Sequence, residues 1–100
     1  MTAFAVEYVY DPARTDDLAT VRPEHREFLA GLVAAGSLLA SGPWLDNAAP
    51  GALLIVVAED LDAAQRLLDD DPFHRAHLIT HRTLRPWNPV IGELSEHATT

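Results

Sequence analysis

The sequence contains no cysteine, and it has only 7 Lys and Arg residues against 15 Asp and Glu, which gives a formal net charge of -8. The lack of cysteine excludes disulfides, thiolate catalysis and zinc bound by cysteine. The scarcity of basic residues argues against nucleic acid as a partner, because proteins that bind the phosphate backbone gather Lys and Arg on one face. We therefore expect a protein without disulfides that does not bind nucleic acid.

The sequence also lacks a basic leader, a long apolar run at its start, internal repeats and low-complexity segments. Glu7 interrupts the first apolar stretch, so we expect neither a signal peptide nor a membrane anchor, with a cytoplasmic location as the default. The 100 residues, 48% of them hydrophobic, suit one globular domain. We predict a single domain over residues 1–100, with an ordered core over about 3–92 and a frayed tail over 95–100.

Periodic apolar patterns are present in the first part of the chain. Residues 3–10 alternate in the period of a strand. Pro23 suits the first position of a helix and the acids after it favour the N-terminal dipole, so a helix is predicted from there to Gly36. Its inward stripe rises in steps of three and four residues and contains one polar member, His25, beside Phe28, Leu29, Leu32 and Val33.

The second part of the chain predicts a hairpin, a helix and a final strand. Asp60 is a suitable cap for the helix, and Pro72 is expected to end it. The predicted elements are strands 37–45 and 51–58, a helix from 61, a helical turn at 73–76, a strand over 77–85 that Pro86 interrupts, and a short edge strand over 90–94.

This order, β-α-β-β-α-β, predicts an α+β fold of the ferredoxin-like kind, with an antiparallel sheet and two helices on one face. Several of the strands are apolar on both faces, whereas two helices can cover only one. A second copy of the chain is the simplest cover for the other face. We therefore predict a homodimer.

A candidate site is built around Asp71-Pro72-Phe73, which places a carboxylate at a rigid turn between a helix and the last long strand. His25, on the inward stripe of the first helix, is its natural partner. The carboxylate would fix the imidazole tautomer and favour the protonated ring, whereas a nearby helix N-terminus would oppose protonation. The alternative is structural: a satisfied core histidine, with Asp71 capping the turn.

Four further residues are candidates for binding a small-molecule ligand. Arg22 is either an anion clamp beside His25 or a solvated residue at the helix start. Ser41 is a candidate lining residue, although no Gly-x-Ser-x-Gly nucleophile elbow is present to support a serine hydrolase. Trp44 and Phe73 either wall the pocket or serve only in packing.

Three histidines, His74, His77 and His81, are close in the sequence and raise the question of a metal site. The proline turn makes a shared site hard to form, and surface histidines in an acidic protein are the simpler explanation. We predict no metal and no cofactor.

Four motifs in order carry a resemblance to the YCII-related family of the dimeric α+β-barrel class. The match runs from about Phe4 to Gly92, and the order and spacing of the motifs both fit. The motifs are Arg22-x-x-His25, Gly36-Ser37-Leu38-Leu39-Ala40-Ser41-Gly42-Pro43, Asp71-Pro72-Phe73 and Arg85-Pro86-Trp87.

The resemblance implies a ferredoxin-like protomer, a dimer whose sheets pack together, and a pocket in which His25 and Asp71 are the suspected catalytic residues. At least one relative is implicated in eliminating chloride from a chlorinated hydroxyquinol. The sequence departs from its relatives at His77, where they commonly have glycine, and at Trp44, where an aliphatic residue commonly follows Gly-Pro.

Two functions remain open from the sequence. The first is a cofactor-independent enzyme in which His25 is a general acid or base, Asp71 orients it, and Arg22 or Ser41 helps to position an anionic or phenolic substrate for elimination or isomerisation. The second is a non-catalytic dimeric module that uses the same pocket to hold a metabolite.

Overall fold

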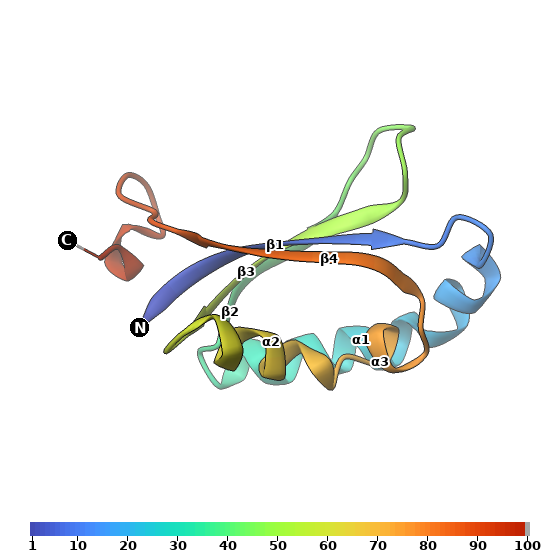
Figure 1. The fold of residues 1–100 in the computed structure, drawn as a ribbon, viewed down its shortest axis with the longest axis horizontal. Helices are drawn as coiled ribbons and strands as arrows, with labels where there is room; N and C mark the ends of the chain where they lie inside the picture. The colour runs from blue at the N-terminus through green and yellow to red at the C-terminus, as the bar shows by residue number, and fades with distance from the viewer. Residues whose placement is uncertain (100) are drawn as a thin grey trace.

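The computed structural model describes residues 1–99, in which a four-stranded antiparallel sheet of order β2-β3-β1-β4 carries all its α-helices on one face (Figure 1). This arrangement confirms the predicted ferredoxin-like α+β fold. The elements are β1 (Thr2–Tyr10), α1 (Thr15–Ala34), β2 (Leu38–Pro43), β3 (Gly51–Ala58), α2 (Leu61–Asp69), α3 (Pro72–Arg75), β4 (Ile79–Trp87) and a 3-10 helix (Ser95–His97).

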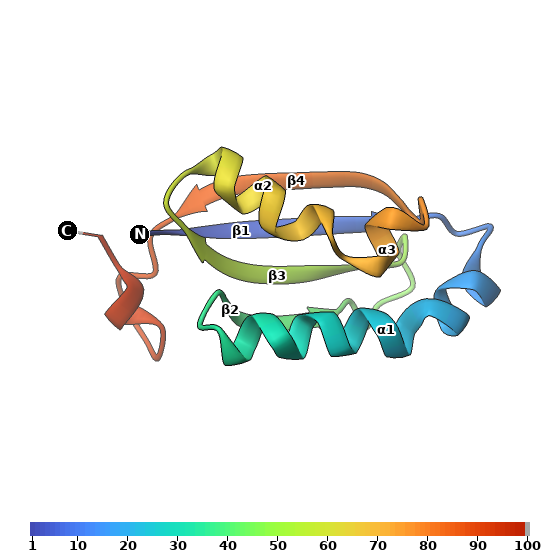
Figure 2. The ribbon, with the colours of Figure 1, turned by 90° about the horizontal axis from the view of Figure 1, so that it is seen from below.

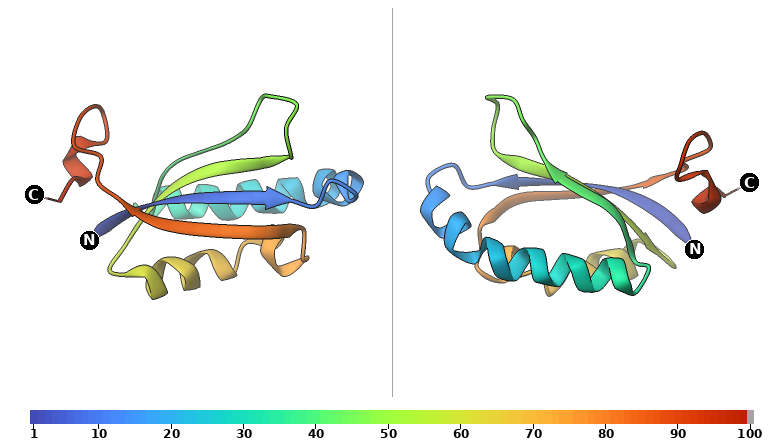
Figure 3. Two further views of the ribbon diagram at one scale, coloured as in Figure 1. Left: turned by 45° about the horizontal axis from the view of Figure 1, so that its top comes forward. Right: turned by 180° about the vertical axis from the view of Figure 1, so that it is seen from behind.

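α1 covers one part of the sheet face, and α2 together with α3 covers the rest. α1 lies along β2, at one edge of the sheet, whereas α2 lies over the strands between β4 and β3, and α3 packs beside α1 (Figure 2). The loop between β2 and β3 projects from the other face, away from the helices (Figure 3). We call that uncovered side the open face of the sheet.

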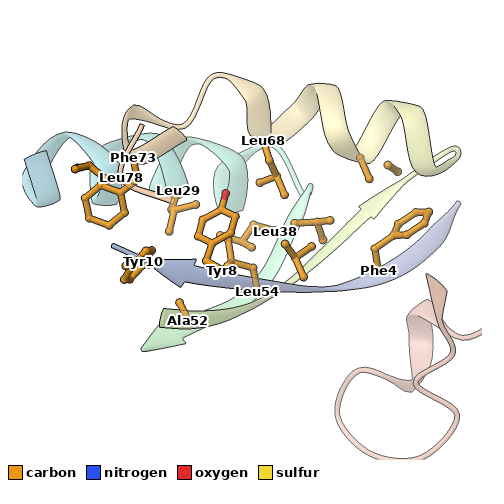
Figure 4. Close-up of a cluster of buried hydrophobic side chains, with 14 of the residues drawn as sticks. Phe4, Tyr8, Tyr10, Leu29, Leu38, Ala52, Leu54, Leu68, Phe73 and Leu78 are labelled. Carbon is orange, nitrogen blue, oxygen red and sulfur yellow. The ribbon is translucent and has the colours of Figure 1, made fainter. Parts of the chain in front are cut away.

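The core lies between the sheet and the helices. β1 alternates as the sequence predicts, with Phe4, Val6, Tyr8 and Tyr10 all buried. Figure 4 shows Phe4 and Tyr8 pointing from the strand toward the helices. The helices contribute the other half of the core, for example Leu68 of α2. Burial of this apolar surface is the main term that holds the two layers together.

The start of α1 corrects the prediction from Pro23. The helix begins at Thr15, with Asp16 and Asp17 in its first turn, and Pro23 lies inside it on the exposed side. Burial of Leu18 explains the earlier start, because this side chain is 3% exposed and packs in the core. Packing of the first two turns thus outweighs the backbone hydrogen bond that proline removes.

The end of α1 is as predicted, whereas one member of its stripe is not buried. Gly36 follows the helix with a φ of 79°, a conformation that glycine adopts without strain. Leu29 and His25 are buried, but Val33, predicted as an inward anchor, is 57% exposed.

The hairpin and the second helix match their predictions. β2 and β3 pair antiparallel, and Asp60 caps α2 by accepting a hydrogen bond of 2.8 Å from the backbone N–H of Ala63. The predicted extra turn of helix is α3. It is a separate helix that begins at Pro72 and is not a continuation of α2.

The last strand corrects two predictions. β4 continues through Pro86 to Trp87, because β4 is an edge strand and proline is tolerated where the missing N–H would point away from the neighbouring strand. Residues 90–94 form bends and turns instead of a strand. The side-chain amide of Asn88 closes this segment into a loop with two hydrogen bonds to the backbone of Thr99, of 2.8 and 2.9 Å.

His77 is the one residue other than glycine with a positive φ, 57°, in the described part of the chain. This left-handed conformation costs about 1–2 kcal/mol for an L-residue, whereas glycine loses only about 0.5–1 kcal/mol more chain entropy on folding. His77→Gly should therefore raise the free energy of unfolding by about 0.5 kcal/mol in urea denaturation. His77→Ala, which keeps the Cβ, is the control, and an equal gain from it would contradict the explanation.

Candidate functional site

Asp71 is a fully buried carboxylate that accepts hydrogen bonds from three elements. It is the N-cap of α3, where Oδ1 accepts from the backbone N–H of Phe73 at 2.9 Å. The same oxygen lies 2.8 Å from Nδ1 of His25 on α1. The hydroxyl of Tyr8 on β1 donates to Oδ2 at 3.0 Å. The predicted contact between Asp71 and His25 is therefore present, and Tyr8 joins it.

The imidazole of His25 is held in a fixed orientation on two sides. Its ring stacks on Phe73, with centroids 3.9 Å apart and an interplanar angle of 8°. An ionised carboxylate only accepts hydrogen bonds, so Nδ1 carries the proton that faces Asp71, and Nε2 is the ring nitrogen that Asp71 leaves free. In residues 1–99 the only fully buried side-chain nitrogen or oxygen without a partner is Nη1 of Arg82. Nε2 of His25 therefore keeps access to solvent.

The position of His25 corrects one electrostatic expectation. Because α1 begins at Thr15, His25 lies about three turns into the helix, beyond the reach of its N-terminal dipole.

A cavity of about 400 Å³ lies beside the pair, between α1, β2 and α3. Four of the residues proposed from the sequence line it: Arg22 and His25 from α1, Ser41 from β2 and Phe73 from α3. Asp71 stands behind His25 and does not line the cavity. The volume lies in the range of small-molecule sites.

Trp44 lies away from this cavity. It is 45% exposed on the open face of the sheet, where it stands beside Glu7 in one shallow depression and beside Leu53 in another. It is therefore not placed to contact a ligand beside His25.

The cavity also contains residues that the sequence analysis did not single out, namely Tyr10 and Arg26. Tyr8 and Tyr10 belong to the strand predicted over residues 3–10 but were not predicted as site residues, although the strand face that they share could have placed them beside the site. Burial raises the pKa of Tyr10 to about 12; the charge of Asp71 adds to this rise and Arg22 opposes it. Burial, followed by the charge of Asp71, also raises the pKa of Tyr8. Both phenols are neutral hydrogen-bond donors at pH 7.

The other histidines are dispersed. Nε2 of His74 is 3.7 Å from Asp69, and His77 and His81 are exposed on the turn and on β4. Within residues 1–99, no group of three or more His, Asp or Glu side chains is placed to hold a metal ion. No helix in the same range is long and apolar enough to cross a membrane.

The two tyrosines, the only ones in the chain, allow a direct check by absorbance titration. In the native protein no phenolate should form near the ordinary value of 10.0, and the first phase, from Tyr10, should centre near pH 12. Because the folded pKa lies above the unfolded one, the stabilisation from neutral Tyr10 is present below pH 10 and is lost as the pH rises toward 12. Tyr10→Phe should remove that first phase, and a native phase near pH 10 would contradict the site described above.

Comparison with solved structures supports the fold. The chain is similar to 5-chloro-2-hydroxyhydroquinone dehydrochlorinase (TftG) from Burkholderia phenoliruptrix, solved in complex with 2,5-dihydroxybenzoquinone, with a TM-score of 0.76 and 22% identity over 86% of this chain and 93% of that one. An antibiotic biosynthesis monooxygenase is similar with a TM-score of 0.55 and 16% identity over 88% and 97%. At these identities the likeness concerns the fold alone.

Comparison with curated sequences goes further. The chain is 33% identical over 94 residues to Protein YciI of Escherichia coli and to that of Shigella flexneri, a match that covers 83% of this chain and 96% of each relative. Residues 2–88 match the YCII-related domain. The chain therefore belongs to the YCII-related domain family.

Proposed function

We propose that this protein is a cofactor-independent enzyme that transfers a proton to or from a small anionic or phenolic metabolite in the cavity beside His25. One observation carries the proposal: Asp71 holds Nδ1 of His25 at 2.8 Å, while Nε2 of the same ring keeps access to solvent at the cavity wall. An imidazole oriented on one side by a buried carboxylate and open on the other is the arrangement of a general base.

The side chains at the cavity determine how the proposed proton transfer would proceed. Nε2 of His25 takes a proton from the substrate, and the electron pair left behind forms a double bond. In an elimination a leaving group departs as an anion with its own electron pair; in an isomerisation the imidazolium returns the proton to another atom. Asp71 stabilises the imidazolium in both cases. Arg22 and the hydroxyl of Tyr10 stand where negative charge on the substrate would be stabilised.

The dehydrochlorinase with the same fold supports an elimination, because its name describes such a reaction and its ligand is a dihydroxybenzoquinone. At 22% identity this likeness suggests a class of probe rather than a substrate. The second candidate is a binding module that uses the cavity without proton transfer. It is favoured by the capping bond from Phe73 to Asp71, which gives the carboxylate a structural task as well.

Deuterium exchange from D2O into a panel of small oxo acids and phenols, followed by mass spectrometry, tests proton transfer across many substrate classes at once. The wild-type protein should label at least one member of the panel. His25→Gln should lower the exchange rate by about 100-fold or more, since general acid-base catalysis contributes ~10²–10⁴-fold. Asp71→Asn should lower it as well, because the amide no longer stabilises the imidazolium.

The melting temperatures of the variants show whether His25 acts in proton transfer or only stabilises the fold. His74→Gln, at a partly exposed histidine outside the cavity, is the matched control and should leave both exchange and melting temperature unchanged. If His25→Gln unfolds the chain, Arg22→Gln at the cavity wall gives an independent test of the same exchange. Binding of panel members with no exchange in the wild-type protein would favour the binding module and overturn the enzyme.

We also infer that two copies of the chain pair through the open face of the sheet. This face carries Leu53 and Ile55 at its centre and the side chains of Trp44 and Trp87 around them, with Trp44, Leu53 and Trp87 38–45% exposed. Exposed apolar surface of this kind on one face is typical of a protein interface.

Light scattering on the purified chain should give twice its mass of 10.9 kDa. Leu53→Arg should shift the protein to a monomer, because it places a charge at the centre of the apolar patch. Leu61→Arg is the control: Leu61 is similarly exposed, at 42%, but begins α2 on the other side of the sheet. A wild-type monomer at micromolar concentration would contradict the dimer.

A further inference from the structure

The cavity extends well beyond the reacting nitrogen of His25. Arg22, Arg26, Ala30 and Val33 all line it, at spacings that place them on one face of α1. The eleven-residue step from the first to the last corresponds to about 16 Å along the helix axis. Proton transfer at His25 uses only one end of this wall, so the rest is available for another part of the ligand.

The two ends of the cavity differ in chemistry. The chain reverses at Gly36, so β2 runs back along α1 and brings Leu38 opposite Val33. That end is wholly apolar. At the other end Arg22, Arg26 and Tyr10 line the cavity together with His25, and Ser41 adds a hydroxyl. The cavity therefore has a polar, positively charged end and an apolar end.

The charges at the polar end have no partner in the part of the chain that the structure describes. Arg14, Arg75 and Arg82 each contact a carboxylate within 4.0 Å, whereas Arg22 and Arg26, like Arg66 and Arg85, make no such contact. Two arginines one turn apart repel each other, which costs a helix about 0.2–0.5 kcal/mol. In a chain of net charge -8, this pair is a local positive site at which an anion would relieve the repulsion.

We propose that the cavity binds an elongated carboxylic acid, with its carboxylate between Arg22 and Arg26 and an apolar tail along Ala30, Val33 and Leu38. The tail lies away from the reacting end, so it supplies binding energy and places the acidic group and the atoms next to it within reach of Nε2 of His25. This inference deepens the proposed function, because it names the substrate class for the same cavity and rests on that cavity being a ligand site.

A chain-length series tests the proposal in the full-length protein. Calorimetric titration at pH 7 with butanoate, hexanoate and octanoate should show affinity rising with chain length, by up to about fourfold per added methylene, the value for a methylene that is fully buried against apolar side chains. Val33→Gln should remove most of this increase for octanoate. The double variant of Arg22→Gln and Arg26→Gln should instead weaken all three acids by a similar factor of about tenfold or more.

Ala34→Gln is the matched control, because Ala34 is an exposed neighbour on α1 that does not line the cavity. It should leave the series unchanged. Affinity that does not depend on chain length, or an equal effect of Val33→Gln and Ala34→Gln, would overturn the proposal. His25→Gln keeps the two proposals apart: it should abolish deuterium exchange while the length dependence persists, so proton transfer can fail without the binding class failing.

Discussion

The buried carboxylate of Asp71 is the group on which the rest of the structure depends. Removing a carboxylate from water costs several kcal/mol, and the bonds from Tyr8, His25 and the backbone of Phe73 offset that cost. These donors come from β1, α1 and α3, so the interaction that fixes the imidazole also joins the sheet to its helices. Stability and site geometry therefore share one set of hydrogen bonds.

The sequence predicts most of the fold because its signals are local and consistent. The alternation of residues 3–10, the cap at Asp60 and the turn at Asp71 each act within a few residues. The predicted start of α1 was wrong because Pro23 gives a strong local signal, while Leu18, whose core partners lie far from it in sequence, decides the outcome. The family motifs indicated His25 and Asp71. The contributions of Tyr8 and Tyr10 depend on the positions of their hydroxyl groups in the folded chain, and a pattern of apolar residues does not predict those positions.

Electrostatics gives the cavity a character opposite to that of the whole molecule. A chain with a formal charge of -8 repels anions at long range, yet its cavity presents Arg22 and Arg26 beside the neutral phenol of Tyr10. Apolar walls such as Phe73 lower the local dielectric, so the attraction between an arginine and an anion is stronger in the cavity than in water. The proposed selection of anions would therefore act at short range, at this cavity.

Pro86 has a consequence for how copies of this chain can meet. It lies on the outer edge of β4, where it removes a hydrogen-bond donor from the row that another strand would need. At the opposite edge β2 is short, has an irregular register near Leu38 and ends at Pro43. Both borders of the sheet thus resist extension by a strand of a neighbouring molecule, which protects the protein against edge-to-edge growth into fibres.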